Sequence, residues 1–98
     1  MKTSTDIEKI LKSNIHNLKK EYNLNSIGIF GSYIRGEHDQ NSDLDILVDF
    51  EKPISLLKFI KLENDLSKIF GVKVDLVMKK ALKPAIGKRI LEEIKYVS

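Results

Sequence analysis

The sequence predicts an α/β (α+β) fold in which a small mixed β-sheet is flanked by helices. Segments with apolar residues at helical spacing alternate with short strand-like segments, and glycine or proline marks most of the borders between them. One strand-like segment, residues 44–50, is acidic on one side and apolar on the other. A sheet with one apolar face must bury that face against helices. The expected order is helix, strand, short turn-helix, strand, helix, strand, helix.

The first helix is expected from Ser4 or Thr5, which can cap it, to about Glu21. Its early acidic residues suit the positive end of a helix. The apolar side chains fall on one stripe, which is typical of a helix packed on one side against a core. They are Ile7, Ile10, Leu11, Ile15 and Leu18.

Three segments are predicted to be strands: residues 26–30, ending at Gly31, residues 44–50 and residues 72–77. Because side chains on a strand alternate between faces, the apolar and the acidic residues of the second strand fall on opposite faces. Its apolar side chains should face the helices, and the side chains of Asp43, Asp45, Leu47 and Asp49 should point the other way.

Two further long helices are expected. One begins at Pro53, which suits a first helical turn, and stops at Gly71. Its predicted buried face consists of Leu56, Leu57, Phe59, Ile60, Leu66, Ile69 and Phe70. Pro84 opens the last helix, which is expected to carry Ile86, Ile90, Leu91, Ile94 and Val97.

The length of 98 residues fits a single domain over residues 1–98. No apolar run approaches the roughly 20 residues of a membrane span, and the absence of cysteine excludes disulfides and fits a cytoplasmic location. The formal charge of +3 arises mainly in the C-terminal third. The lysines of this segment either suit an anionic substrate or partner or form a solvated surface. They are too dispersed to predict direct nucleic-acid binding.

Paired carboxylates are the most informative chemical feature. Asp43 and Asp45 share one side of a strand, about 6.5–7 Å apart at Cα, and such a pair can converge on metal ions. Asp75 is similarly placed on the next strand and completes the cluster if the two strands are neighbours. Three carboxylates facing one way repel one another without a cation. Taken singly, Asp43 could cap a turn and Asp45 could be a solvated strand residue; together the three acids predict a magnesium site.

A tight turn precedes these acids. Gly31 allows a phosphate to approach the backbone, and the Ser32 hydroxyl and neighbouring N–H groups can bind phosphate oxygens. Arg35 is a candidate phosphate fork, or equally a structural ion-pair partner of Glu37 or a strand acid. The P-loop pattern is absent, which disfavours a P-loop nucleotidase.

At these residues the chain resembles the DNA polymerase beta-like nucleotidyltransferase superfamily, whose signature is Gly-Ser, about ten residues, then Asp-x-Asp. Residues 31–37, GSYIRGE, and 42–48, SDLDILV, resemble more narrowly the minimal nucleotidyltransferases, or MNT proteins. Ile34 departs from the alanine that is commoner in the motif. This resemblance extends over nearly the whole chain.

The resemblance implies a polymerase beta-like core in which Asp43, Asp45 and Asp75 bind Mg²⁺, two ions being expected, and Asp75 helps to activate the attacking hydroxyl. Ser32 would hold the triphosphate of ATP. MNT proteins typically pair with a HEPN-family toxin, and some transfer AMP from ATP to a tyrosine hydroxyl of that partner. The implied function is therefore an enzyme, a protein adenylyltransferase that acts as an antitoxin.

Two other functions remain open. The chain could be a non-catalytic antitoxin that neutralises its partner by binding alone, although the presence of all three acids favours an enzyme. A nucleic-acid polymerase or RNA-tailing enzyme is disfavoured because the chain has no room for a template- or RNA-binding domain.

Overall fold

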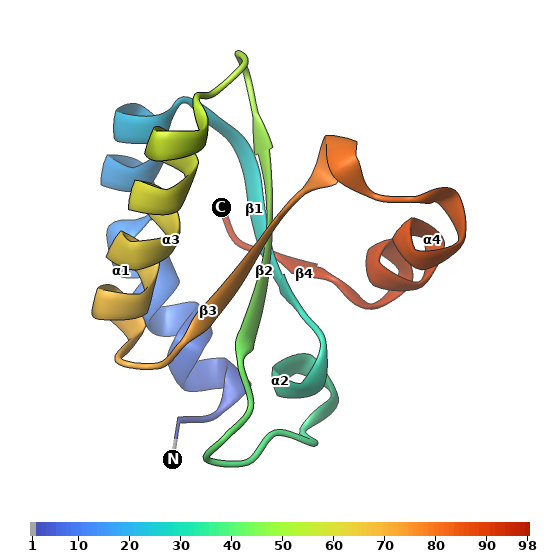
Figure 1. Cartoon of the computed structure of the whole chain (residues 1–98). Helices are drawn as coiled ribbons and strands as arrows, with labels where there is room; N and C mark the ends of the chain where they lie inside the picture. Colours follow the sequence, from blue (N-terminus) through green and yellow to red (C-terminus); the bar gives the residue numbers. More distant parts are fainter. Residues whose placement is uncertain (1) are drawn as a thin grey trace.

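The computed structural model describes residues 2–98 (Figure 1). A four-stranded mixed sheet in the order β3-β2-β1-β4 forms its centre. β2 runs antiparallel to β1 and parallel to β3, and β4 pairs antiparallel with β1. The predicted fold class is confirmed. The elements are α1 (Ser4–Tyr22), β1 (Leu24–Phe30), α2 (Ser32–Arg35), β2 (Leu44–Phe50), α3 (Leu56–Phe70), β3 (Val74–Met78), a 3₁₀ turn (Lys79–Ala81), α4 (Pro84–Glu93) and β4 (Lys95–Tyr96).

Helices α1 and α3 cover one face of the sheet, and α4 lies on the other side (Figure 1). The main core lies between the sheet and the two long helices, and its residues are those that the apolar spacing of α1 and of β2 predicts. Its fully buried side chains include Ile7, Leu11, Ile27, Ile29, Leu44, Ile46, Val48, Leu62, Leu66 and Phe70.

The opposite face of the sheet has much less apolar cover. There α4 packs through a small cluster of Phe30, Leu47 and Ile90, joined by three partly buried neighbours. The rest of this face carries the acidic side chains of β2 and β3. The division of β2 into an apolar and an acidic face is therefore as predicted, with Leu47 buried under α4.

Several boundaries differ from the sequence-based expectation. α3 begins after Ser55, whose hydroxyl accepts from the Lys58 N–H at 3.2 Å, and not at Pro53. The expected last helix ends at Glu93, so Ile94 and Val97 are not helical. The chain instead forms the short strand β4, which is held to β1 by backbone hydrogen bonds that apolar periodicity does not reveal.

The predicted buried face of α3 is wrong in its first turns. Leu56 and Leu57 are 73% and 80% exposed, and Ile60 is 43% exposed, because these three residues lie outside the stripe of α3 that is buried, which is formed by Leu62, Leu66 and Phe70. Within residues 2–98 no helix combines the length and apolar character that a membrane span requires.

Tyr22 links the end of α1 to α3. Its ring is 2% exposed, its hydroxyl donates to the Asp65 carboxylate, and the Lys61 ammonium donates to the hydroxyl at 3.2 Å. Burial, followed by the bond to Asp65, raises the pKa of Tyr22 to about 12. The neutral hydroxyl is therefore the form that the folded chain prefers.

Ionisation of Tyr22 should weaken the fold at alkaline pH. The folded-state pKa of about 12 exceeds the ordinary value of 10.0, so the stabilisation is complete below pH 10 and is lost as pH rises toward 12. Between these pH values the free energy of unfolding of wild type should fall by about 1–2 kcal/mol more than that of Tyr22→Phe. Urea unfolding across this range measures it, with Tyr96→Phe, whose side chain is exposed, as the control. Equal slopes for wild type and Tyr22→Phe would contradict the assignment.

Candidate active site

Two acidic side chains meet on neighbouring strands. β2 and β3 are parallel, and Asp45 is the register partner of Asp75, with Leu44 opposite Val74. Adjacent strands lie about 4.8 Å apart, so the two carboxylates are side by side on the face away from α1 and α3. Asp43 immediately precedes β2 and is the third member. The neighbouring strands that the sequence prediction required for Asp75 are present.

The acids interact electrostatically. Burial raises the pKa of Asp45 to about 6, and the charges of Asp75 and Asp43 add to this effect, while Arg35 opposes it. At neutral pH the fold therefore holds an ionised Asp45 against an unfavourable environment. Lys73 lies 3.9 Å from the Asp43 carboxylate, but the lysine side chain is 81% exposed, so this contact offsets little of the repulsion.

The Gly31-Ser32 turn lies directly against this cluster. Gly31 has φ +79°, and a Cβ at this position would lie 2.1 Å from Oδ2 of Asp45. The Asp45 carboxylate thus occupies the space in which any other residue would place its side chain. Ser32 begins α2 next to it and is partly exposed. The two halves of the sequence motif are therefore in contact.

Arg35 is held by two glutamates. Its Nε donates to Glu37 at 2.9 Å, and its Nη1 donates to both carboxylate oxygens of Glu93 at 3.1 and 3.0 Å. The Gly31 N–H also donates to Glu93, at 3.0 Å. Burial would raise the pKa of Glu93, but the bonds from Arg35 and Gly31 together hold that pKa below its usual value. Arg35 was predicted to be either a phosphate ligand or a structural ion-pair partner of Glu37 or of a strand acid. The ion pair with Glu37 is present, and the second partner is Glu93 of α4 instead of a strand acid.

Sequence reasoning missed Glu93. The residue lies among charged residues near the end of an amphipathic helix, beside Glu92, and nothing in the pattern separates the two. Only the tertiary structure, in which the end of α4 lies against the Gly31 turn, distinguishes Glu93 from Glu92.

The acidic cluster fits magnesium as two carboxylates plus outside ligands. In the described chain, residues 2–98, no group of three or more His, Cys, Asp or Glu side chains is arranged to hold a metal ion by itself. Magnesium is commonly held by one or two carboxylates, with water and phosphate oxygens completing its shell. The hard oxygen donors of Asp43 and Asp45, and the raised pKa of Asp45, suit a divalent cation that arrives with a phosphate ligand.

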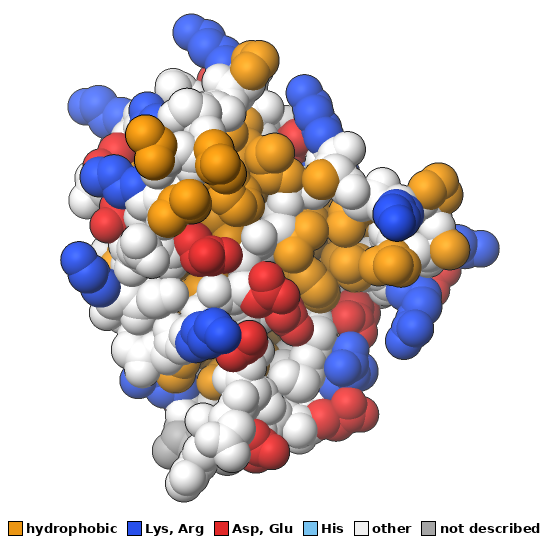
Figure 2. Space-filling view, viewed as in Figure 1, with side chains coloured by type: hydrophobic (Ala, Val, Ile, Leu, Met, Phe, Trp, Pro, Cys, Tyr) orange, Lys and Arg blue, Asp and Glu red, His pale blue; other side chains and the backbone are white. Residues whose placement is uncertain are grey.

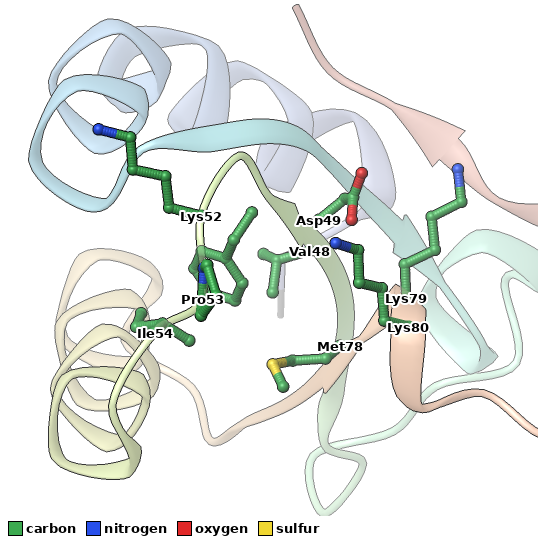
Figure 3. Close-up of a pocket in the computed structure, with 9 residues that line it drawn as sticks. Val48, Asp49, Lys52, Pro53, Ile54, Met78, Lys79 and Lys80 are labelled. Atoms are coloured by element: carbon green, nitrogen blue, oxygen red, sulfur yellow. The ribbon is translucent and has the colours of Figure 1, made fainter.

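On the molecular face in Figure 2, acidic side chains lie between two groups of hydrophobic side chains. A separate pocket of about 230 Å³ lies at the far end of β2 and β3 (Figure 3). Val48, Ile54 and Met78 give it an apolar lining, and Lys79 and Lys80 lie at its side. The three predicted metal ligands are not among its lining residues, so it is distinct from the acidic cluster.

Comparisons with known proteins identify the family to which this chain belongs. Residues 7–97 match the family described as nucleotidyltransferase domain. The protein adenylyltransferase MntA of Thermococcus cleftensis is 50% identical over 97 residues, which cover 99% of this chain and 98% of that protein.

Solved structures share the fold. A chain in the crystal structure of a toxin–antitoxin with AMP-PNP superposes with a TM-score of 0.73 at 25% identity, covering 87% of this chain and 70% of the other. A chain in the complex of the tri-AMPylated HEPN toxin of Shewanella oneidensis with an MNT antitoxin superposes with a TM-score of 0.67 at 21% identity, over 91% and 70% of the two chains. The family match and the half-identical MntA relative establish that this chain belongs to the nucleotidyltransferase domain family, among the minimal nucleotidyltransferases.

Proposed function

We propose that this protein is a Mg²⁺-dependent adenylyltransferase that transfers AMP from ATP to a hydroxyl, in particular a tyrosine hydroxyl, of a HEPN-family toxin. The observation that carries the proposal is the cluster of Asp43, Asp45 and Asp75 around the start of parallel strands, in contact with the Gly31 turn. The half-identical relative is named a protein adenylyltransferase, and two structures of similar fold are toxin–antitoxin complexes.

The acids have distinct roles in the proposed reaction. Asp43 and Asp45 would hold Mg²⁺, for which two ions fit the family. The metal, when bound, neutralises charge on the phosphates and on the leaving pyrophosphate. Asp75, exposed beside Asp45, accepts the proton of the acceptor hydroxyl. The acceptor oxygen then forms a bond to the α-phosphorus, the bond to pyrophosphate breaks, and AMP remains on the acceptor.

The turn and α2 would bind the triphosphate. The Ser32 hydroxyl, at the start of α2 beside Asp45, makes no hydrogen bond within residues 2–98 and would donate to a phosphate oxygen. The Arg35 guanidinium lies at the end of α2, where Nε and Nη1 are paired with Glu37 and Glu93, and its Nη2 would donate to a phosphate oxygen. This placement brings the phosphates and the carboxylates to the same point, as a shared metal requires.

The acceptor would be presented by the partner protein. Residues 1–98 would act as one catalytic domain, and the hydrophobic groups that flank the acids in Figure 2 suit a protein partner better than a bare nucleic acid. ATP as donor and the lack of cysteine also suit a cytoplasmic location.

Replacing either strand acid should abolish transfer without unfolding the chain. Asp43→Asn or Asp45→Asn should lower the rate of AMP incorporation into the partner toxin by about 100-fold or more, because amides bind Mg²⁺ poorly. The measurement is incorporation of labelled AMP, with circular dichroism as the folding check. Asp49→Asn, further along the same face of β2, is the matched control and should retain activity. Incorporation that persists in both variants would refute the assignment.

Intact mass of the mixed proteins separates the enzyme from the non-catalytic antitoxin. Incubation of the chain with its partner toxin and Mg·ATP should increase the mass of the toxin by one or more AMP groups, because transfer is covalent. A toxin that is bound and inhibited at unchanged mass would instead establish neutralisation by binding alone.

Gly31 should be irreplaceable for a reason beyond its backbone angle. Gly31→Ala would drive a Cβ into the Asp45 carboxylate, and should abolish transfer. Gly36→Ala is the control: Gly36 has φ +70°, but a Cβ there would meet nothing within 4 Å. Its backbone strain should lower stability by about 1 kcal/mol while leaving most activity. Equal loss of activity in both variants would show that strain alone, and not the contact with Asp45, explains the glycine.

A further inference from the structure

The Glu93 carboxylate joins the C-terminal helix to both groups proposed to bind phosphate. It accepts the Gly31 N–H at 3.0 Å and two bonds from Nη1 of Arg35 at 3.1 and 3.0 Å. Gly31 and Glu93 are far apart in the sequence, so these bonds hold together segments that no local structure connects.

Helix physics gives no local reason for an acid at this position. Glu93 is the last residue of α4, where the negative end of the helix disfavours a carboxylate by a few tenths of a kcal/mol to about 1 kcal/mol. Glu92 has the same disadvantage, but it is exposed and makes no side-chain hydrogen bond or ion pair within residues 2–98. The Glu93 side chain is 26% exposed, and its partners lie outside its own helix.

The contacts of Arg35 leave one edge of its guanidinium open. Nε is bonded to Glu37 and Nη1 to Glu93, whereas Nη2 has no hydrogen-bond partner in the described part of the chain. A guanidinium fixed at two positions loses little side-chain entropy when a ligand binds to the third. The Glu37 side chain is 64% exposed, so Glu93 is the better-ordered of the two anchors.

We propose that Glu93 is a positioning residue for the nucleotide: it orients the Arg35 guanidinium and the Gly31 turn so that the open edge of Arg35 faces the triphosphate. This inference rests on the proposed function, because it requires the turn to bind a nucleotide. Glu93 itself touches neither substrate nor metal; it acts through Arg35 and Gly31.

Calorimetric binding of Mg·AMP-PNP tests the proposal without a partner protein. In Glu93→Gln the amide oxygen still accepts from Gly31, but the charge that holds Arg35 is lost. We expect the dissociation constant to rise about 5- to 20-fold. Glu92→Gln removes the same charge one residue away and should bind like wild type. In an Arg35→Ala background, Glu93→Gln should change the dissociation constant less than about twofold, because the group it positions is gone.

Each other outcome is decisive. Wild-type affinity in Glu93→Gln, while wild type itself binds, would overturn this inference and leave the proposed function standing. Tighter binding would also overturn it, and would show that Glu93 competes with the phosphates. An equal loss of affinity with and without Arg35 would reduce Glu93 to a structural contact. Failure of the wild-type chain to bind Mg·AMP-PNP would remove the proposed function, and this inference with it.

Discussion

The contact between the Asp45 carboxylate and the Gly31 backbone is the constraint on which the rest of the site depends. β1 ends at Phe30, directly before this glycine, and Phe30 is the register partner of Asp45 in the antiparallel pairing of β1 with β2, which brings the two together. Because a side chain at residue 31 would collide with Oδ2, the close approach is possible only for glycine at φ +79°. The turn proposed to bind phosphate and the carboxylate proposed to bind a metal therefore share one location.

The sheet divides its two faces between stability and chemistry. α1 and α3 bury the apolar face. The stability of this large core offsets the repulsion between the acids on the other face. The raised pKa of Asp45 reflects the unfavourable free energy of holding this carboxylate ionised, because burial and two neighbouring carboxylates disfavour its charged form. Active sites commonly hold such unfavourable charges, which ligands relieve. On the same face as the acids, the small α4 cluster and the Glu93 bonds attach α4 to the sheet and to the Gly31 turn.

Much of this could be predicted from the sequence. Alternation in residues 44–50 indicated which face of β2 is acidic, which the structure confirms. The spacing of Asp43 and Asp45 indicated the candidate site, and their role there stays a prediction. The features that could not be predicted depend on tertiary contacts between helices and strands. Apolar spacing in α3 does not reveal which side of its first turns faces the core, so Leu56 and Leu57 were wrongly expected to be buried. A two-residue strand such as β4 is too short for any periodic pattern. Glu93 gains its role only from tertiary contacts with Arg35 and Gly31.

The most direct test of the acidic cluster is the pH dependence of unfolding for wild type and Asp45→Asn, with and without Mg·AMP-PNP. A folded-state pKa of about 6, above the ordinary 3.8, means that Asp45 costs nothing below pH 3.8 and destabilises the chain increasingly as pH rises to 6. Without ligand, Asp45→Asn should therefore become more stable than wild type by about 1–2 kcal/mol above pH 6, after allowance for solvent screening, and should match it near pH 3.8. Ligand should stabilise wild type and not the variant. A variant no more stable than wild type at neutral pH, and equally stabilised by the ligand, would contradict the account.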